Sequence, residues 1–168
     1  DLREFHVGNA RHELVSIGDL GPWNPERPIE DLTKITTAAR DMWNWKELPF
    51  DHYVFLFSFG PGGGGLEHLN STLITSSPTG MESESGYHGW LGLVSHEYFH
   101  AFNVKRLRPV ELGPFDYENP PTTSSLWISE GLTSYYGDLM VRRAGLSTEA
   151  MLLRQISGQI AQLQKSPG

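Results

Sequence analysis

The residues of this sequence that are best spaced for chemistry are two histidines four positions apart, His96 and His100. On a helix, side chains at positions i and i+4 lie one above the other, with Cβ atoms about 5–6 Å apart. Two imidazoles at that spacing can hold one ion at about 2.0–2.1 Å from each nitrogen, which is half of a tetrahedral zinc site. Glu97 lies beside such an ion and can act as a general base. The HExxH pattern therefore predicts hydrolytic chemistry at one zinc ion.

A catalytic zinc site needs a third protein ligand, while its fourth position stays open for water. A third histidine six residues after His100 is absent, because position 106 is an arginine. Glu130 is a candidate, since it lies in the first turns of a predicted helix whose other early positions are apolar. A carboxylate in such a place is costly unless it is paired or bound to a metal. The alternative is an ordinary first-turn glutamate that is favoured by the helix dipole.

Four consecutive glycines, Gly62 to Gly65, interrupt an extended segment just before Glu67 and His68. They have two interpretations. One is a flexible hairpin loop, and the other is backbone that approaches a ligand closely because no Cβ stands in the way. The run is not a phosphate loop, because no Gly-Lys-Ser/Thr follows it.

Composition limits the classes of protein and partner. A chain of 168 residues suits one domain with a hydrophobic core, so we expect a single domain over residues 1–168. The net charge of −7 argues against a nucleic-acid partner. Lys105, Arg106 and Arg108 form one basic cluster, which we interpret as the end of the metal-motif helix. No apolar run is long enough for a membrane span, and the absence of cysteine leaves the compartment open.

Periodicity predicts an α+β fold. The expected strands lie within residues 1–20, over 52–59 and over 66–74, and the expected helices lie from about 29 to before 49, over 87–104, over 126–143 and after 147. Ser124 or Ser125 is expected to cap the third helix and Ser147 the fourth, with a glycine C-cap at Gly145. Gly89 and Gly92 either share the metal-facing side of the second helix, leaving room for substrate, or Gly89 belongs to a preceding turn.

Three motifs in order carry a resemblance to a known family. They are Gly64-Gly65-Leu66-Glu67-His68, the run from His96 to Arg106 (HEYFHAFNVKR), and the run from Glu130 to Tyr136 (EGLTSYY). HExxH followed by Leu-Trp-x-x-Glu-Gly resembles the gluzincin metallopeptidases. Within them, the three motifs together resemble the glycyl aminopeptidase family of bacterial enzymes, which often carry a PDZ domain. The resemblance covers residues from about 31 to 146.

The resemblance implies a thermolysin-like catalytic lobe, with a small mixed sheet packed on helices and one zinc on His96, His100 and Glu130. The expected activity is an aminopeptidase that prefers N-terminal Gly or Ala, with peptides as substrates. Full-length members are longer, so the chain is expected to be a truncated catalytic domain that lacks an N-terminal β region and the PDZ domain. A soluble protein of the bacterial cytoplasm or periplasm is expected.

Related aminopeptidases bind the free α-amine of the substrate with the glutamate of a Gly-x-Met-Glu-Asn motif, and Glu67 matches that glutamate by position. We therefore take Gly64, Gly65, Glu67 and His68 as candidate substrate-binding residues. The chain departs from the motif with Leu66 for Met and His68 for Asn. A thermolysin-like endopeptidase thus stays open, as does a non-catalytic module that binds metal or peptide.

Overall fold

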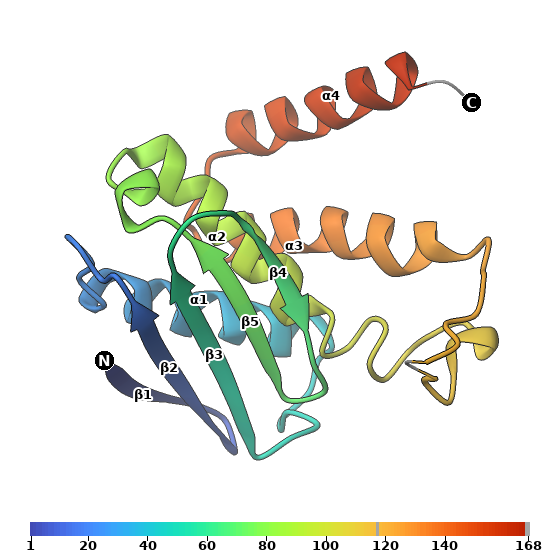
Figure 1. Ribbon diagram of the computed structural model, residues 1–168, viewed down its shortest axis with the longest axis horizontal. Helices are drawn as coiled ribbons and strands as arrows, with labels where there is room; N and C mark the ends of the chain where they lie inside the picture. Colours follow the sequence, from blue (N-terminus) through green and yellow to red (C-terminus); the bar gives the residue numbers. More distant parts are fainter. Residues whose placement is uncertain (117, 167–168) are drawn as a thin grey trace.

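The computed structural model describes residues 1–116 and 118–166, and its described strands form one five-stranded sheet in the order β1-β2-β3-β5-β4 (Figure 1). The strands are β1 (Leu2–Val7), β2 (Ala10–Gly18), β3 (His52–Phe59), β4 (Gly64–Glu67) and β5 (Ser71–Ser76). The central pairs β2–β3 and β3–β5 are parallel, whereas β1–β2 and β4–β5 are antiparallel. The sheet is therefore mixed, as predicted, and β4 is an edge strand.

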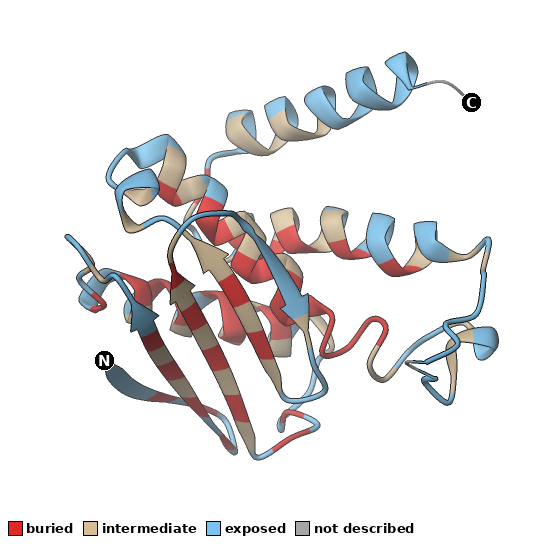
Figure 2. Cartoon of the chain, viewed as in Figure 1, coloured by how far each residue is buried: buried red, intermediate tan, exposed pale blue. Residues whose placement is uncertain are grey.

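Strand β3 supplies much of the core. Its sequence is almost continuously apolar, but its burial alternates: Tyr53, Phe55, Phe57 and Phe59 are buried, and the residues between them are half-buried. Side chains alternate between the two faces of a strand, so only one face of β3 is fully covered. Figure 2 shows this banding on the sheet, with the buried residues of the helices opposite it. The predicted interior position is confirmed, because β2 and β5 flank β3 on both sides.

The helices are α1 (Glu26–Met42), α2 (Glu84–Phe99), α3 (Leu132–Arg143) and α4 (Glu149–Lys165). Short 3₁₀ turns cover Pro78–Met81 and Val110–Leu112, and a π-helical turn covers Trp127–Gly131 directly before α3. Helix α2 contacts β4, β5, α1 and α3, so it joins the sheet to the C-terminal helices. Helix α4 extends away from the body and has no fully buried residue (Figure 1).

Several predicted boundaries are wrong by a few residues. Helix α2 begins earlier than expected because Ser83 caps it, its side-chain oxygen accepting a hydrogen bond from the N–H of Gly86. It also ends at Phe99 instead of 104, so the basic cluster lies beyond the helix. Thr148, and not Ser147, caps α4. The glycine C-cap at Gly145 is confirmed by its φ of +75° and by the bond from its N–H to the carbonyl oxygen of Arg142.

The basic cluster has tertiary partners instead of a helix terminus. Arg106 donates hydrogen bonds to the backbone carbonyl oxygens of Leu69 and Ala101 and to the side chain of Asn70. It therefore joins the turn before β5 to the segment after α2. Across the described ranges 1–116 and 118–166, no helix has the length and apolar character needed to cross a membrane.

Candidate metal centre

The structure brings together the three residues that were predicted as zinc ligands. His96 lies in the last turn of α2, His100 is its C-cap residue, and Glu130 lies in the π-helical turn. The Nε2 atoms of the two histidines are 3.1 Å apart, and Oε2 of Glu130 is 3.3 Å from Nε2 of His96 and 3.5 Å from Nε2 of His100. Ligand atoms about 2.0–2.1 Å from a tetrahedral zinc ion lie about 3.3 Å from one another. The three atoms thus outline one face of a tetrahedron of the right size.

Hydrogen bonds hold the two imidazoles in a ligand-ready orientation. Nδ1 of His100 lies 2.9 Å from the backbone carbonyl oxygen of Asn103, to which it can only donate. The remaining nitrogen, Nε2, then carries the lone pair that a metal needs. On the other histidine, Nδ1 of His96 lies 3.4 Å from the hydroxyl oxygen of Ser134. Both rings therefore point their Nε2 atoms at Glu130.

Asn103 also connects the two segments that carry the ligands. Its side-chain amide lies 2.9 Å from the carbonyl oxygen of Ile128, 3.1 Å from that of Ser129 and 3.0 Å from the hydroxyl of Thr133. The first two are carbonyls of the π-helical turn that holds Glu130, and such turns widen a helix locally and occur often at functional sites. One side chain thus fixes the carboxylate ligand relative to both histidines. No sequence pattern indicates this role of Asn103.

The charges of the centre favour a bound cation. In their protonated forms, His100 and His96 donate hydrogen bonds to the Glu130 side chain, and these hold the pKa of its carboxyl far below the usual range. Burial alone would lower the pKa of His100, but the bonds to Glu130 and to the Asn103 carbonyl raise it on balance. The cluster thus already stabilises positive charge between its imidazoles and its carboxylate. A divalent ion at the same point could be bound by Nε2 of His96, Nε2 of His100 and Oε2 of Glu130.

Glu97 is buried, with 5% of its surface exposed, and lies against the glycine run. Burial raises the pKa of its carboxyl, the charges of His96 and His100 oppose this, and the charges of Glu67 and Glu130 add to it. A Cβ atom on Gly65 would overlap the Glu97 carboxyl group. Strand β4 therefore passes Glu97 at a distance that only glycine allows, which supports the close-approach interpretation of the glycines.

The other candidate substrate-binding residues do not all lie close to the metal centre. Glu67 offers an oxygen to a group formed with Glu97 and His100, in which the ligand atoms lie within 4.8 Å of one another. Gly64 has a φ of +129°, a conformation that favours glycine. His68 is exposed in the turn after β4, where its Nδ1 lies 3.3 Å from the carbonyl oxygen of Leu66. The structure thus brings Gly65 and Glu67, but not the imidazole of His68, to the centre.

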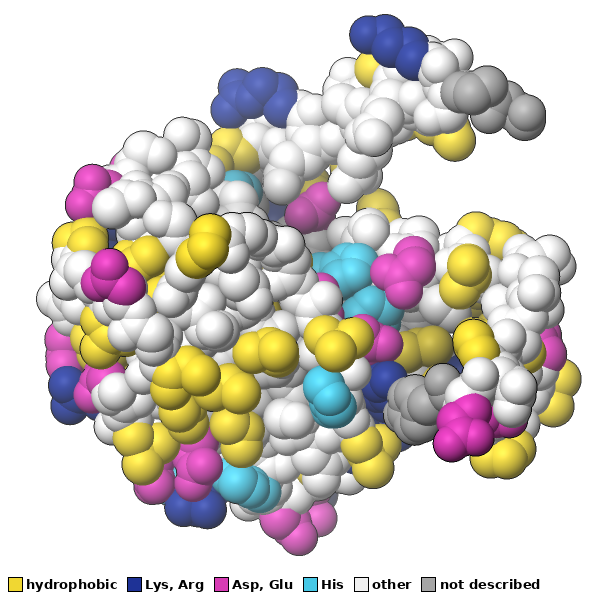
Figure 3. Space-filling model, in the orientation of Figure 1, with side chains coloured by type: hydrophobic (Ala, Val, Ile, Leu, Met, Phe, Trp, Pro, Cys, Tyr) yellow, Lys and Arg dark blue, Asp and Glu magenta, His cyan; other side chains and the backbone are white. Residues whose placement is uncertain are grey.

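Lys105 also lies at the centre, although the sequence pattern predicts it at the end of a helix. Its Nζ atom lies 3.2 Å from Oε1 of Glu67, and only 11% of its side chain is exposed. The same ammonium group lies 4.8 Å from the ring centroid of Phe115. The Glu67 carboxylate therefore already has one positively charged neighbour, the ammonium group of Lys105. Figure 3 shows this face of the molecule, where histidine and acidic side chains gather in a hollow between the body and the C-terminal helices.

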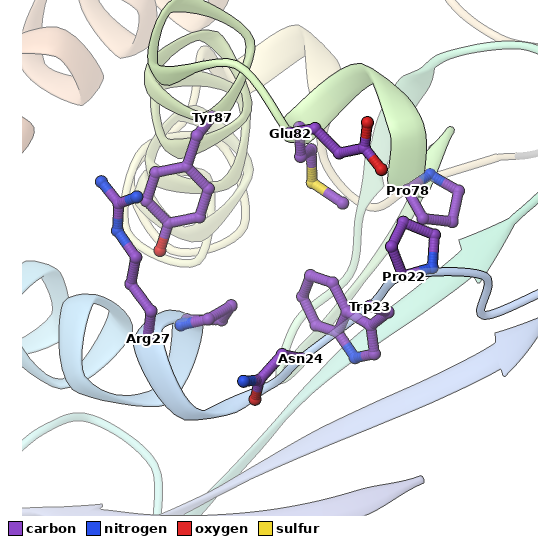
Figure 4. A pocket seen from close by; sticks show the side chains of 9 residues that line it. Pro22, Trp23, Asn24, Arg27, Pro78, Glu82 and Tyr87 are labelled. Atoms are coloured by element: carbon purple, nitrogen blue, oxygen red, sulfur yellow. The ribbon is translucent and has the colours of Figure 1, made fainter.

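A separate cavity of about 260 Å³ lies at the other end of α2, near its N-terminus (Figure 4). Pro22, Trp23 and Tyr87 give it an apolar lining, and Arg27 lies at its edge. The guanidinium of Arg27 is 3.9 Å from the Tyr87 ring centroid and is bonded to both carboxylate oxygens of Glu84. None of the three candidate metal ligands lines this cavity. It is therefore distinct from the metal centre.

Two comparisons with known proteins find similarity to aminopeptidases. Residues 89–168 match the model of the M61 glycyl aminopeptidase family. Among curated proteins, none matches the chain. The solved structure of the aminopeptidase N family protein from Idiomarina loihiensis is similar to the chain, with a TM-score of 0.83 and 34% identity. The similarity covers 91% of this chain and 27% of that one, so the chain spans about a quarter of its relative. Residues 89–168 are thus similar to the M61 glycyl aminopeptidase family, and most of the chain is similar to about a quarter of an aminopeptidase N family protein.

Proposed function

We propose that the chain is the catalytic part of a one-zinc aminopeptidase that removes glycine or alanine from the N-termini of peptides. The observation that carries the proposal is the convergence of His96, His100 and Glu130 at tetrahedral spacing, with the Glu97 carboxyl group beside them. The match to a family described as glycyl aminopeptidases supports the preference for a small N-terminal residue. The metal, its identity and the substrate are parts of this proposal.

A bound zinc ion would supply Lewis-acid activation of the scissile carbonyl and of water. Glu97 would accept a proton from the attacking water and pass it to the leaving amine. A carboxyl group with a raised pKa suits both steps, because it holds a proton more readily than an exposed glutamate does. Burial beside Gly65 would keep bulk water from that proton.

Strand β4 would position the peptide. Within the described part of the chain it pairs only with β5, so the backbone N–H and C=O groups of its other edge have no partner strand there. An extended peptide can add to such an edge as a further strand. Since Gly65 lies against Glu97, a peptide paired there would pass the metal centre. Glu67, at the end of the strand, would then bind the free α-amine through a charge-assisted hydrogen bond.

An endopeptidase is the second candidate, and the ion pair between Lys105 and Glu67 favours it. A carboxylate that already has a lysine partner attracts a substrate amine less strongly. Peptides with free and with acetylated N-termini separate the two activities. An aminopeptidase cleaves Gly-Gly-Phe-amide and rejects its acetylated form, whereas an endopeptidase cleaves both.

The central experiment combines zinc analysis with hydrolysis for the wild type and Glu97→Gln. The proposal expects about one zinc ion per chain in both proteins, and hydrolysis only in the wild type. Glu149→Gln, at the exposed start of α4, is the matched control and should behave like the wild type. A non-catalytic metal-binding module would hold zinc without hydrolysis in every variant. Absence of tight zinc from the wild type would contradict the proposal outright.

The remaining expectations concern the whole protein. An N-terminal β-rich region and a PDZ domain stay predictions, as does a location in the bacterial cytoplasm or periplasm. The length of the Idiomarina loihiensis relative, of which this chain covers 27%, leaves room for further domains. Mass analysis of the protein expressed from its native gene would test them.

A further inference from the structure

Helices α2 and α3 pack very closely beside the metal centre. The hydroxyl of Ser95 donates a hydrogen bond of 2.8 Å to the carbonyl oxygen of Gly137. A Cβ atom on Gly137 would lie 3.1 Å from Cα of His96, which is tighter than an ordinary contact. The two helices run antiparallel here, since Ser134 meets His96 and Asp138 meets Gly92. The close packing thus places Asp138 about one turn of α2 from His96.

A cavity of about 310 Å³ lies beside this contact and is lined by residues of α2, α3 and α4. Its lining includes His96, Glu97, Gly89, Gly92 and Asp138. A Cβ atom on Gly89 would meet no atom within 4 Å, and one on Gly92 would lie 3.6 Å from Oδ1 of Asp138. The absence of side chains at the two glycines therefore leaves room for one long side chain between the metal centre and the Asp138 carboxylate.

Among the residues in 1–116 and 118–166, no lysine, arginine or histidine forms a salt bridge with the carboxylate of Asp138. Its carboxylate oxygens accept hydrogen bonds of 3.2 Å from the side-chain amides of Gln155 and Gln159, which are neutral. Burial raises the pKa of its carboxyl, whereas the Gln159 bond and the charges of His88 and His96 act in the opposite direction. A cation in the cavity would offset the cost of burying this charge.

The order of residues along α2 shows where the cavity lies relative to Glu67. Glu67 groups with Glu97 and His100, at the C-terminal end of the HExxH turn. The cavity includes Gly89 and Gly92, which precede His96 on the same helix. The two features therefore lie at opposite ends of the metal-binding turn. If the substrate amine binds at Glu67, the cavity receives the residue that follows the cleaved bond.

We propose that this cavity is a subsite for a lysine or arginine side chain on the carboxyl side of the cleaved bond, with Asp138 as the residue that determines the preference. The proposal rests on the proposed peptidase function and adds a substrate class to it. The preferred peptides begin with a small residue that is followed by a basic one. The ammonium or guanidinium group of that second residue forms an ion pair with Asp138.

The hydrolysis test compares Gly-Lys-Phe-amide with Gly-Met-Phe-amide, since methionine is a long neutral side chain. The wild type is expected to favour the lysine peptide about tenfold in kcat/KM, and Asp138→Asn to cleave both equally at the methionine rate. Asp138→Glu keeps the charge and should keep a preference of the same sign. Asp41→Asn, at an exposed position of α1, is the control and should keep the tenfold ratio.

A binding test gives a readout without turnover. Calorimetry on Glu97→Gln should give a Kd for Gly-Lys-Phe-amide about tenfold below that for Gly-Met-Phe-amide, and Asp138→Asn in that background should remove the difference. Equal kcat/KM values or equal Kd values for the two peptides in proteins with intact Asp138 would overturn the subsite. Loss of hydrolysis with both peptides, while calorimetry still shows the lysine preference, would overturn the proposed function and leave the subsite standing.

Discussion

The side-chain amide of Asn103 lies 3.1 Å from the backbone carbonyl oxygen of Ser129, the residue directly before Glu130. The backbone carbonyl of the same asparagine accepts a hydrogen bond from Nδ1 of His100. One residue thus contacts both segments that supply the candidate ligands. Its two contacts determine the distance between them, so the tetrahedral spacing depends on a side chain that binds no metal itself.

Replacing Asn103 with aspartate should weaken zinc binding about 10–100-fold, as loss of such supporting bonds does in other metal sites. Aspartate has the same shape but would turn a carboxylate oxygen toward the carbonyls of Ile128 and Ser129, which cannot donate. Competition with a chromophoric chelator measures the affinity. Asn24→Asp, at an exposed position where only the side-chain oxygen is used, should leave it unchanged. Equal affinities in the two variants would contradict the role of Asn103.

Gly65→Ala should abolish most hydrolysis while leaving the metal bound. The added methyl group would overlap the Glu97 carboxyl group, so either β4 or Glu97 must move. A displacement of about 1 Å at a reacting group can cost about 100-fold in rate. The measurement is kcat on a glycyl peptide together with zinc content. Gly63→Ala is the matched control, since the nearest atom to its new Cβ would be 4.0 Å away. A Gly65→Ala enzyme within threefold of wild type would refute the close approach.

The two histidine ligands could be predicted from the sequence, because they lie on one helix. The contacts between segments that are distant in the chain could be predicted only in part. The spacing of His96 and His100 is defined by helix geometry, which a pattern can report. Glu130 could be found because zinc chemistry requires a third ligand, although its distance from the histidines is a tertiary fact. Asn103 gave no signal, because its acceptors lie 25–30 residues away in the chain.

Lys105 and Asp138 were missed for different reasons. No glycine or proline marks the end of α2, so the pattern extended the helix to 104, whereas the chain turns after Phe99 and Val104 adopts a φ of +114°. The ammonium of Lys105 consequently reaches Glu67 instead of a helix terminus. The place of Asp138 depends on the contact of Gly137 with His96, which no single-helix pattern contains.

Acidification should unfold the protein partly through His12. This histidine is fully buried, its Nε2 lies 3.1 Å from the hydroxyl of Tyr98, and burial lowers its pKa from 6.5 to about 4. Between those pH values the unfolded chain binds the proton more tightly, so stability falls as the pH decreases. The loss approaches about 3 kcal/mol at pH 4, from about 1.4 kcal/mol for each pKa unit.

Urea denaturation of wild type and His12→Gln at several pH values measures this contribution. Glutamine does not titrate, so the stability of the variant should fall less steeply between pH 6.5 and 4. His68→Gln, at an exposed position in the turn after β4, should keep the wild-type slope. If wild type and His12→Gln lose stability in parallel, proton uptake by His12 does not contribute.

Lys105→Met should improve the binding of peptides with a free α-amine. The lysine lies 3.2 Å from Glu67, so it competes with the substrate amine for the same carboxylate. Methionine keeps the length of the side chain and its contact with the Phe115 ring. A partly buried ion pair of about 1 kcal/mol corresponds to a KM about three- to tenfold lower for glycyl peptides, with kcat unchanged. Lys165→Met, at the exposed end of α4, should change neither constant. A higher KM in Lys105→Met would mean that the lysine holds Glu67 in place for the amine, because removing a competitor cannot weaken binding.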